Sequence, residues 1–455
     1  MKSYDIVILG AGPAGYVGAL RAGQKGASAA VVERGELGGV CLNEGCIPTK
    51  ALLDVCHTVH RVGTLVKSGA AAGSATVQLA QAVEGKNAMV KKLTGGIEFL
   101  LKGRKVDIVR GAGTVTGPNE LAIEGGEPIG FKSLVVATGS RPVELPGLAF
   151  DGTRIISSAD ALQLRDVPET LAIVGGGYIG CEFADMFAGL GAKVTVIEML
   201  DGILPGVDPD LAAAVKPSLK KAGVEILTGT KVEKAGVSGD AVTVELSSGE
   251  SKTVEKVLVC VGRRPNADVG DLASLGVAVG NTGIDIDGRC ATGASNVYAA
   301  GDVTGVRMLA HVASKQAEVA VENALGGEAE IDYAAVPECV FTSPEIASVG
   351  MTEAAAKEEG LAVKTAKFPF AALGRAVVTG DTEGMVKIVG GEEGDVVGMQ
   401  IAGRGASEMV ALGGLAIQVG VTVEDLAEMI VMHPTFSEAI REAAEVWTGR
   451  PLHTK

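Results

Sequence analysis

The 455-residue sequence lacks any apolar run long enough to cross a bilayer, and it carries no excess of basic residues. The longest apolar stretches, such as the one ending at Ala137, fall far short of the roughly 20 residues that a membrane-spanning helix needs. We therefore expect a soluble protein with no membrane partner. Lysine and arginine total 40 against 55 aspartate and glutamate residues, a net charge of −15. This acidic balance does not favour a polyanionic ligand, so we expect no nucleic-acid partner.

Cysteine is also scarce, and no cysteine or histidine pattern has the spacing of a metal site. Seven cysteines in 455 residues are an odd and sparse set for a disulfide-stapled secreted protein. No signal peptide is evident, because the strand-like sequence YDIVIL already begins at Tyr4. We expect a cytoplasmic protein with no bound metal. Cys41 and Cys46 stand only five residues apart, and in a reducing compartment such a close pair favours a catalytic role.

Glycine is abundant, with 65 residues, about twice the usual share of roughly 7%. Gly10, Gly12 and Gly15 form a G-x-G-x-x-G motif between a strand-like and a helix-like segment, and the next strand ends in Glu33. In such a βαβ unit the glycines permit a tight turn, close approach of a pyrophosphate and packing of helix on strand, and the acid binds a ribose. The motif alone could arise by chance in a glycine-rich chain. Strand, helix and acid in register favour a dinucleotide site.

The same pattern returns in the segment LAIVGGGYIGCEFADMFAGLGAKVTVIE. It contains Gly175, Gly177 and Gly180, and its second strand ends in Glu198, again 18 residues after the third glycine. A single hydride exchange needs only one bound cofactor and a substrate, so two such units indicate two different dinucleotides that exchange electrons. A flavin and a nicotinamide are the favoured pair.

The rest of the chain predicts buried strands that end in glycine turns, followed by a different kind of domain. Residues 78–101 are typical of a helix, and buried strands are expected near 134–140, 254–266 and 296–305. From Pro337 onward, alternating strands and then helices indicate an α+β domain without a dinucleotide motif. The predicted fold class is therefore α/β, with two Rossmann-like dinucleotide-binding domains and a C-terminal α+β domain.

The cysteine pair lies in GGVCLNEGCIPTK, directly after the first βαβ unit. Five residues of regular helix advance about 7.5 Å, whereas a disulfide normally allows a Cα separation of at most about 6.8 Å. A bonded pair must therefore distort the start of a helix, which Asn43 and Gly45 tolerate. A helix N-terminus also favours the reactive thiolate. The alternative is two buried, unreactive thiols, and the neighbouring dinucleotide motif argues against it.

Eight motifs in this order resemble those of the flavin-dependent pyridine nucleotide-disulfide oxidoreductases. They are GAGPAG with Glu33, GGVCLNEGCIPTK, ATGS, GGGYIGCE, VGRRPN, AAGDV, MLAH and HPTFSEAI, and they span essentially the whole chain. Within this family, CLNEGCIPTK, MLAH, FPFAALGRA and HPTFSEA most resemble the dihydrolipoamide dehydrogenase branch. The resemblance implies an enzyme with bound FAD and NAD and a redox disulfide between Cys41 and Cys46.

The resemblance also implies which residues bind the two cofactors. For FAD they are Gly10, Gly12, Gly15, Glu33, Gly39, Lys50, Gly113, Thr138, Gly139, Asp302 and Ala310. For NAD they are Gly175, Gly177, Gly180, Glu198, Val232 and Gly262. The glutamates can accept hydrogen bonds from ribose hydroxyls, which is the role that such an acid has in this kind of unit.

Four further residues are implied to be catalytic beside the two cysteines. Lys50 would place a positive charge near the flavin, with Glu182 as its ion-pair partner. His433 would be the base, because a carboxylate such as Glu438 fixes one imidazole nitrogen and leaves the other free to accept a proton. Of the other histidines, His311 is implied to lie beside FAD, and we interpret His57, His60 and His453 as surface residues without a motif context.

One departure from the resemblance concerns the residues before His433. Dihydrolipoamide dehydrogenases usually read H-A-H-P-T, whereas this chain has Val431 in place of the first histidine. The base is kept, but the glutathione reductase branch has to be weighed. Glu198 would repel a 2′-phosphate, and residues 199–201 contain no arginine to receive one. The sequence therefore favours NAD over NADP.

The resemblance implies four segments: an FAD-binding domain over 1–145, an NAD-binding domain over 146–264, a central segment over 265–335 that completes the FAD site, and an interface domain over 336–455. It also implies a homodimer in which the interface domain lends His433 to the partner's disulfide. The substrate would be a dihydrolipoyl group on the lipoyl-bearing domain of a 2-oxo acid dehydrogenase complex or of the glycine cleavage system. Its electrons would pass through the disulfide, with Cys41 as the interchange thiol and Cys46 against the flavin, to NAD⁺.

Two other functions stay open at this point. The first is NAD(P)H-dependent reduction of glutathione or another low-molecular-weight disulfide. The second is a flavin-bearing redox sensor or structural subunit. The His433 and Glu438 pair argues against the sensor, because a sensor needs no base for a substrate.

Overall fold

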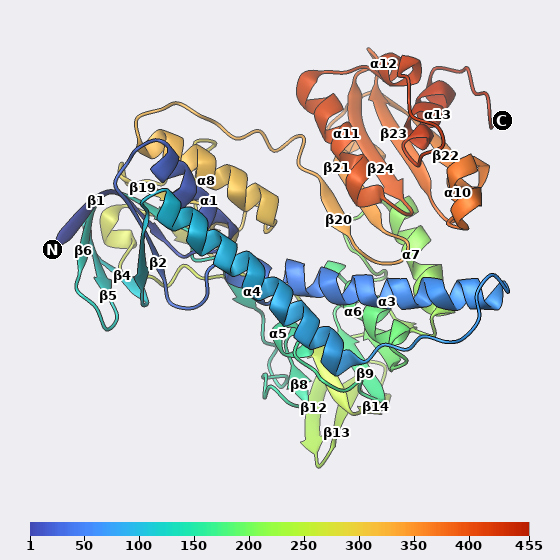
Figure 1. Ribbon diagram of the computed structural model, residues 1–455, viewed down its shortest axis with the longest axis horizontal. Helices are drawn as coiled ribbons and strands as arrows, with labels where there is room; N and C mark the ends of the chain where they lie inside the picture. The colour runs from blue at the N-terminus through green and yellow to red at the C-terminus, as the bar shows by residue number, and fades with distance from the viewer. Residues whose placement is uncertain (455) are drawn as a thin grey trace. The chain divides into compact units, whose positions relative to one another are not determined.

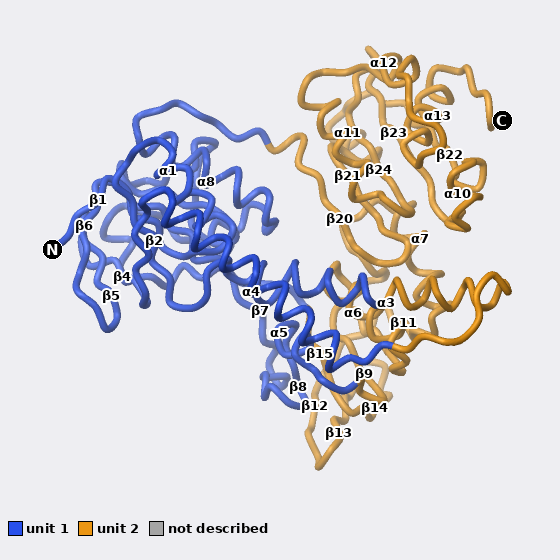
Figure 2. Tube along the Cα trace, viewed as in Figure 1, with its two compact units in different colours: residues 1–55, 77–166, 261–332 blue, residues 56–76, 167–260, 333–455 orange. Residues whose placement is uncertain are grey.

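The computed structural model describes residues 1–454 and groups them into two compact units (Figure 2). Unit 1 consists of residues 1–55, 77–166 and 261–332. Unit 2 consists of residues 56–76, 167–260 and 333 onward. Each unit therefore combines segments that are distant in the sequence, and the first change of unit falls inside helix α3 (Cys46–Lys67).

Unit 1 is built around a sheet in the order β3-β2-β1-β6-β5-β4, with β19 paired to β6. The parallel strands are β1 (Lys2–Leu9), β2 (Ala29–Glu33), β3 (Asp107–Arg110), β6 (Ile129–Val136) and β19 (Val297–Ala299). At one edge, β4 (Gly113–Gly117) and β5 (Glu120–Ile123) pair antiparallel. The central strands are buried on both faces, which is why DIVIL and SLVV read as continuous apolar runs.

Helices α1 (Pro13–Gln24) and α8 (Ala310–Ala324) pack side by side in unit 1 (Figure 1). Small residues allow this close approach, because a Cβ atom at Gly18 would lie 3.4 Å from the Ala317 Cβ. The remaining elements are α2 (Gly39–Asn43), α4 (Leu79–Gly103), α5 (Ser158–Ala161), β7 (Ser140–Pro142), β8 (Ile155–Ile156), β16 (Arg263–Pro265), β17 (Val279–Gly280) and β18 (Gly283–Ile284).

The first half of unit 2 repeats the βαβ design. Four parallel strands of its sheet follow the order β11-β10-β9-β15: β9 (Thr170–Val174), β10 (Lys193–Ile197), β11 (Glu225–Leu227) and β15 (Lys256–Val259). Helix α6 (Tyr178–Gly189) connects β9 to β10, and α7 (Pro209–Lys221) precedes β11. A separate antiparallel sheet contains β12 (Val232–Ser238), β13 (Ala241–Leu246) and β14 (Ser251–Val254).

The second half of unit 2 is built around an antiparallel sheet in the order β20-β21-β24-β23-β22. Its strands are β20 (Glu338–Val340), β21 (Ile346–Gly350), β22 (Val363–Pro369), β23 (Met385–Gly391) and β24 (Val396–Ala402). The helices are α9 (Glu353–Glu358), α10 (Gly374–Thr379), α11 (Ala406–Val419), α12 (Val423–Glu428) and α13 (Glu438–Trp447). Strand residues such as Val386 and Ile388 share one apolar core with α11 and α13, whereas the intervening Lys387 points to the opposite face.

The α/β fold class expected from the sequence is confirmed, with two βαβ units and a C-terminal α+β region. The helix expected over 78–101 is α4, and the buried strands expected near 134, 254 and 296 are β6, β15 and β19. The four domain boundaries remain predictions. The structure groups most of the central segment with the first unit, and most of the segment from 146 to 264 with the C-terminal region. Across residues 1–454, the helices are all too short or too polar to traverse a bilayer.

Candidate active site

The first glycine motif forms a tight turn between β1 and α1. Gly10 has a φ of 101°, and a Cβ atom there would lie 2.4 Å from the Ala137 carbonyl oxygen. A Cβ at Gly15 would lie 1.8 Å from the carbonyl oxygen of Gly10, so the helix can pack here only on glycine. No side chain caps the N-terminus of α1, and its first turn has no acidic residue. Its free N–H groups suit a pyrophosphate.

Glu33 lies at the end of β2, beside this turn. One of its carboxylate oxygens accepts the Ala11 N–H at 2.7 Å, and the other accepts the Gly35 N–H at 2.7 Å. Each oxygen keeps a second lone pair that a ribose hydroxyl can use. Gly39 opens α2 against the turn, where a Cβ would lie 2.6 Å from the Cα of Gly12. The residues of this loop therefore fit the adenosine half of FAD.

The second glycine motif has the same geometry in unit 2. Gly175 has a φ of 107°, and a Cβ at Gly180 would lie 2.0 Å from the Gly175 carbonyl oxygen. The position of a Cβ at Gly177 has no neighbour within 4 Å, and α6 begins without a side-chain cap or an acid in its first turn. Glu198 is buried and accepts the N–H groups of Gly176 at 2.6 Å and Leu200 at 2.8 Å. These residues fit a second dinucleotide.

Other residues assigned to FAD from the sequence lie on neighbouring loops of unit 1. Asp302 begins a short 3-10 helix (Asp302–Thr304), and its Oδ2 accepts the Ser140 hydroxyl at 2.5 Å. The Thr138 hydroxyl donates to the Asn266 carbonyl at 2.7 Å, and Gly139 follows it with a φ of 70°. Gly113, at the start of β4, and Ala310, the first residue of α8, are also half-buried residues of this unit.

The sequence did not single out Arg263, although the VGRRPN motif contains it. Its guanidinium donates to the Ser140 hydroxyl at 2.7 Å and to the Ser140 carbonyl at 2.8 Å, and it lies 3.9 Å from Asp302. Burial lowers the pKa of Arg263, and the negative charges of Asp302, Cys46 and Glu44 oppose this shift because they favour the charged guanidinium. The signal in the sequence was a basic residue directly after a buried strand and its glycine turn.

The two remaining residues assigned to NAD from the sequence belong to different units. Val232 is half-buried at the start of β12 and belongs to unit 2, like the second glycine motif. Gly262 belongs to unit 1, where it is exposed and has a φ of 114°. Their contacts with NAD remain predictions.

The helix is interrupted between the two cysteines. Cys41 lies in α2, Glu44 and Gly45 break the helix, and Cys46 starts α3. This break agrees with the distortion expected for a pair that must come together. The thiols hydrogen-bond with each other, Cys41 being half-buried and Cys46 exposed. The hydrogen bond with Cys46 and burial raise the pKa of Cys41, and the nearby Lys50 ammonium opposes the shift.

The expected ion pair between Lys50 and Glu182 remains a prediction. Lys50 lies one turn after Cys46 in α3 and belongs to unit 1. Glu182 is buried in α6 of unit 2, where its Oε1 accepts the Phe341 N–H at 2.9 Å. This bond places a carboxylate at the start of the C-terminal segment, a contact that the sequence did not predict.

His433, in the loop between α12 and α13, lies beside Glu438, the first residue of α13. The Nδ1 atom of His433 is 2.9 Å from Oε1 of Glu438, and Oε2 of Glu438 accepts the Thr435 N–H at 2.8 Å. The His433 side chain is 77% exposed and that of Glu438 23%. With Nδ1 held by the carboxylate, Nε2 is the nitrogen free to accept a proton.

The structure corrects the expectation that His57 is a surface residue and places the other histidines. His57 is half-buried rather than a surface residue, and its Nε2 lies 2.8 Å from Asp185, which also accepts the Ser343 N–H. His453 is exposed as expected but pairs with Glu442 at 2.8 Å. The sequence missed both partners because Asp185 is 128 residues from His57 and Glu442 follows no recognisable motif. His311 is exposed at the second position of α8.

Comparison with known proteins places this geometry in a family. Residues 4–317 match the pyridine nucleotide-disulphide oxidoreductases, and residues 336–444 match the dimerisation domain of the same family, which supports a homodimer. The chain is 45% identical to a dihydrolipoyl dehydrogenase from Geobacillus stearothermophilus, over 99% of this chain and 97% of that protein. It is also 45% identical to a dihydrolipoyl dehydrogenase from Staphylococcus aureus, over 99% of this chain and 98% of that protein.

A solved structure agrees with these relatives. LpdA from Mycobacterium tuberculosis superimposes with a TM-score of 0.91 at 28% identity, over 98% of this chain and 99% of that one. The matches cover both glycine motifs, the cysteine pair and the C-terminal sheet. The chain belongs to the pyridine nucleotide-disulphide oxidoreductase family.

Proposed function

We propose that this chain oxidises a protein-bound dihydrolipoyl group to the lipoyl disulfide and reduces NAD⁺. The observation that carries the proposal is the contact between the Cys41 and Cys46 thiols, one helical turn before Lys50. Two thiols in contact can form a disulfide that accepts two electrons from a dithiol substrate. The full-length similarity to proteins named dihydrolipoyl dehydrogenase supports this substrate class.

The residues of the chain can carry out the exchange in two steps. Nε2 of His433 accepts a proton from one substrate thiol, and the thiolate attacks Cys41 of the disulfide, which releases Cys46 as a thiolate. The second substrate thiol then attacks the substrate sulfur of the mixed disulfide, and its proton passes to the Cys41 sulfur, which leaves as a thiol while Cys46 stays a thiolate. The substrate has lost two electrons and two protons, and the cysteine pair has gained the two electrons. Lys50 lies close enough to stabilise negative charge on the reduced pair.

Two cofactors complete the reaction. Bound FAD and NAD⁺ supply the two-electron transfer that takes the electrons from the reduced cysteine pair and regenerates the disulfide. The residues that would hold FAD are those of the first glycine loop with Glu33, together with Asp302 and the others assigned from the sequence. The second glycine loop with Glu198 would hold NAD. The Glu198 carboxylate already binds two N–H groups, so a 2′-phosphate would meet an acid that cannot move away easily.

The exposed His433 is consistent with a base that serves the partner chain in a homodimer. The matched dimerisation domain contains this histidine, which supports an active site shared between two chains. We further propose that the electron donor is the lipoyl-bearing domain of a 2-oxo acid dehydrogenase complex or of the glycine cleavage system. The sparse cysteines, three of which are buried as free thiols, support a reducing, cytoplasmic location.

Steady-state kinetics test the proposal. The purified, FAD-loaded protein should reduce NAD⁺ with dihydrolipoamide and with a lipoylated carrier domain, and it should strongly prefer NAD⁺ over NADP⁺. The alternative function, reduction of glutathione or another small disulfide, was weighed because Val431 stands where the dehydrogenase branch usually has a histidine, but the similarity to proteins named dihydrolipoyl dehydrogenase does not favour it. Efficient reduction of such a disulfide by NADPH, without dihydrolipoamide turnover, would overturn the proposal in favour of that alternative.

A further inference from the structure

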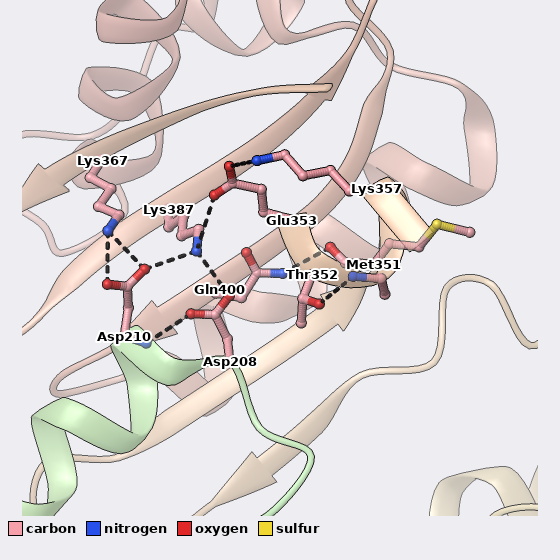
Figure 3. Close-up of polar contacts among 10 residues, drawn as sticks. Asp208, Asp210, Met351, Thr352, Glu353, Lys357, Lys367, Lys387 and Gln400 are labelled. Carbon is pink, nitrogen blue, oxygen red and sulfur yellow. Dashed lines mark hydrogen bonds and ion pairs between the residues drawn. The ribbon is translucent and has the colours of Figure 1, made fainter. Parts of the chain in front are cut away.

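A buried ion cluster in unit 2 lies outside the residues assigned so far (Figure 3). The Lys387 side chain on β23 is only 5% exposed, and its Nζ lies 2.9 Å from Asp208 Oδ2 and 2.8 Å from Asp210 Oδ2. Lys367, its neighbour on β22, also binds Asp210 at 2.8 Å. Glu353 lies 4.0 Å from Lys387. The C-terminal sheet thereby holds the residues that begin α7.

The Lys387–Asp208 pair at the centre of this cluster is removed from water, whereas Asp210, Glu353 and Lys367 stay partly exposed. Burial would lower the pKa of Lys387, but hydrogen bonds to Asp210 and Asp208 outweigh it and raise that pKa, so the ammonium stays charged. Removal of one member of a buried ion pair leaves the other uncompensated, which is strongly unfavourable. Asp208 also accepts the Asp210 N–H and so caps α7. Lys387 therefore holds the residue that caps the start of α7.

Asp208 is the last residue of a loop that begins at Glu198 and lies against the second glycine motif. We call residues 198–208 the acid loop. Gly176 donates its N–H to Glu198, and its carbonyl accepts the Leu204 N–H at 2.7 Å. The buried Ile203 also packs on Gly176, because a Cβ atom there would lie 2.9 Å from the Ile203 side chain. The acid loop and the glycine motif are thus bound to each other at three points.

The acid loop includes a backbone conformation that needs support. Leu204 is buried and has a φ of 56°, in the left-handed region that non-glycine residues rarely adopt. Such a conformation costs free energy and persists only where the surrounding structure determines it. One end of the loop is fixed by the hydrogen bonds of Glu198, and the other by the contact of Asp208 with Lys387.

We propose that Lys387 is a positioning residue for the nicotinamide dinucleotide: by holding Asp208 it keeps the acid loop, and with it Glu198, in place against the second glycine motif. This inference rests on the proposed function, in which that motif binds NAD. Lys387 acts through Asp208 and the loop. A residue of the dimerisation domain would thereby support a cofactor site formed by another part of the same unit.

NADH affinity of the FAD-loaded protein tests this role. We expect Lys387→Met to weaken NADH binding about five- to tenfold, while the KM for dihydrolipoamide stays near its wild-type value. Asp208→Asn is the second variant: its amide oxygen still accepts the Asp210 N–H, but it loses the charge that attracts Lys387. It should weaken NADH binding to a similar extent. The double variant should bind NADH no more weakly than the single variant with the lower NADH affinity, because both changes break the same contact. Lys357→Met is the matched control, since the exposed Lys357 belongs to the same cluster through Glu353 only.

Hydrogen exchange measured by mass spectrometry gives a second readout that does not depend on NADH. Peptides covering residues 198–208 should exchange faster in Lys387→Met and in Asp208→Asn than in the wild type or the Lys357 control. If both folded variants, or Asp208→Asn alone where Lys387→Met does not fold, bind NADH normally, the cluster is only structural and the inference is wrong. Failure of the unmutated protein to bind NADH would instead contradict the proposed function, and with it the inference.

Discussion

Glu438 holds the Nδ1 atom of His433 at 2.9 Å and accepts the Thr435 N–H with its other oxygen. Both carboxylate oxygens are therefore in use, and together they fix the imidazole relative to the start of α13. A second pair of the same chemistry, at 2.8 Å, joins His453 to Glu442 in the middle of that helix. The two pairs join the same kinds of atoms at nearly the same distance, so Glu442 can serve as a control for Glu438.

Replacement of Glu438 by glutamine should lower kcat for dihydrolipoamide by roughly 10²-fold, which is the rate enhancement that a well-placed general base typically contributes. Glutamine has one oxygen where two are needed, so either His433 or the Thr435 N–H loses its acceptor. Glu442→Gln disturbs the equivalent pair and should leave kcat unchanged. Stopped-flow reduction of the enzyme by dihydrolipoamide is the measurement, and equal loss in both variants would argue against a catalytic role for Glu438.

Alkylation should distinguish the two cysteines of the active site from the buried ones. In protein reduced and stripped of FAD, Cys46 should react first with iodoacetamide, because it is exposed and Cys41 is half-buried. With FAD bound, the resemblance puts Cys46 against the flavin, so Cys41 should become the labelled thiol. Burial raises the pKa of Cys56 and Cys181 to about 12, so neither should react at pH 8 before unfolding.

Peptide mass spectrometry after timed labelling reads out this experiment, and labelling in denaturant shows that all seven cysteines can react. Modification of Cys41 in both states would contradict the predicted exchange of accessibility. Rapid labelling of Cys56 in the folded protein would show that this thiol is accessible and would contradict the prediction.

The sequence predicted the two glycine loops well because their requirements are local. Gly10 and Gly15 sit where any side chain would strike a backbone carbonyl, so the residue type itself reports the geometry. Glu33 and Glu198 follow at fixed distances because one helix and one strand intervene. Neighbouring residues along the chain thus carry almost all of the information needed for these loops.

Contacts between distant segments could not be predicted in the same way. Lys387 stands between the apolar Val386 and Ile388, which signals a strand with one polar face. The sequence does not reveal that Asp208, 179 residues earlier, covers that face. The same holds for His57 and Asp185, whose ion pair depends on how separate helices pack. Pairs of this kind are set by tertiary structure and leave no periodic pattern.

Glu198 should determine the choice of nicotinamide cofactor. Its replacement by alanine, combined with Leu200→Arg, should raise the ratio of kcat/KM for NADP⁺ over NAD⁺, because in the proposed function the carboxylate would bind the ribose hydroxyl and repel a 2′-phosphate. Glu225→Ala is the control, since this acid on β11 pairs with Lys252 on β14, a strand of the separate antiparallel sheet. An unchanged ratio would indicate that the second glycine motif does not hold the adenosine ribose.

The last prediction concerns which chain supplies the base. The cysteine pair belongs to unit 1, whereas His433 lies within the matched dimerisation domain of unit 2. If each active site combines the cysteines of one chain with the histidine of its partner, two inactive variants can complement each other. Cys46→Ser and His433→Gln chains should each be poorly active as homodimers. Refolded together, they form mixed dimers in which one site carries both lesions and the other carries none.

The intact site would use the cysteines of the His433→Gln chain and the histidine of the Cys46→Ser chain. When subunits mix at random, about half of the dimers are mixed and each has one good site of two, so turnover should rise toward about a quarter of the wild-type value. If His433 serves the disulfide of its own chain, every active site in the mixture keeps one lesion. Turnover would then stay at the average of the two parents, and the shared active site would be ruled out.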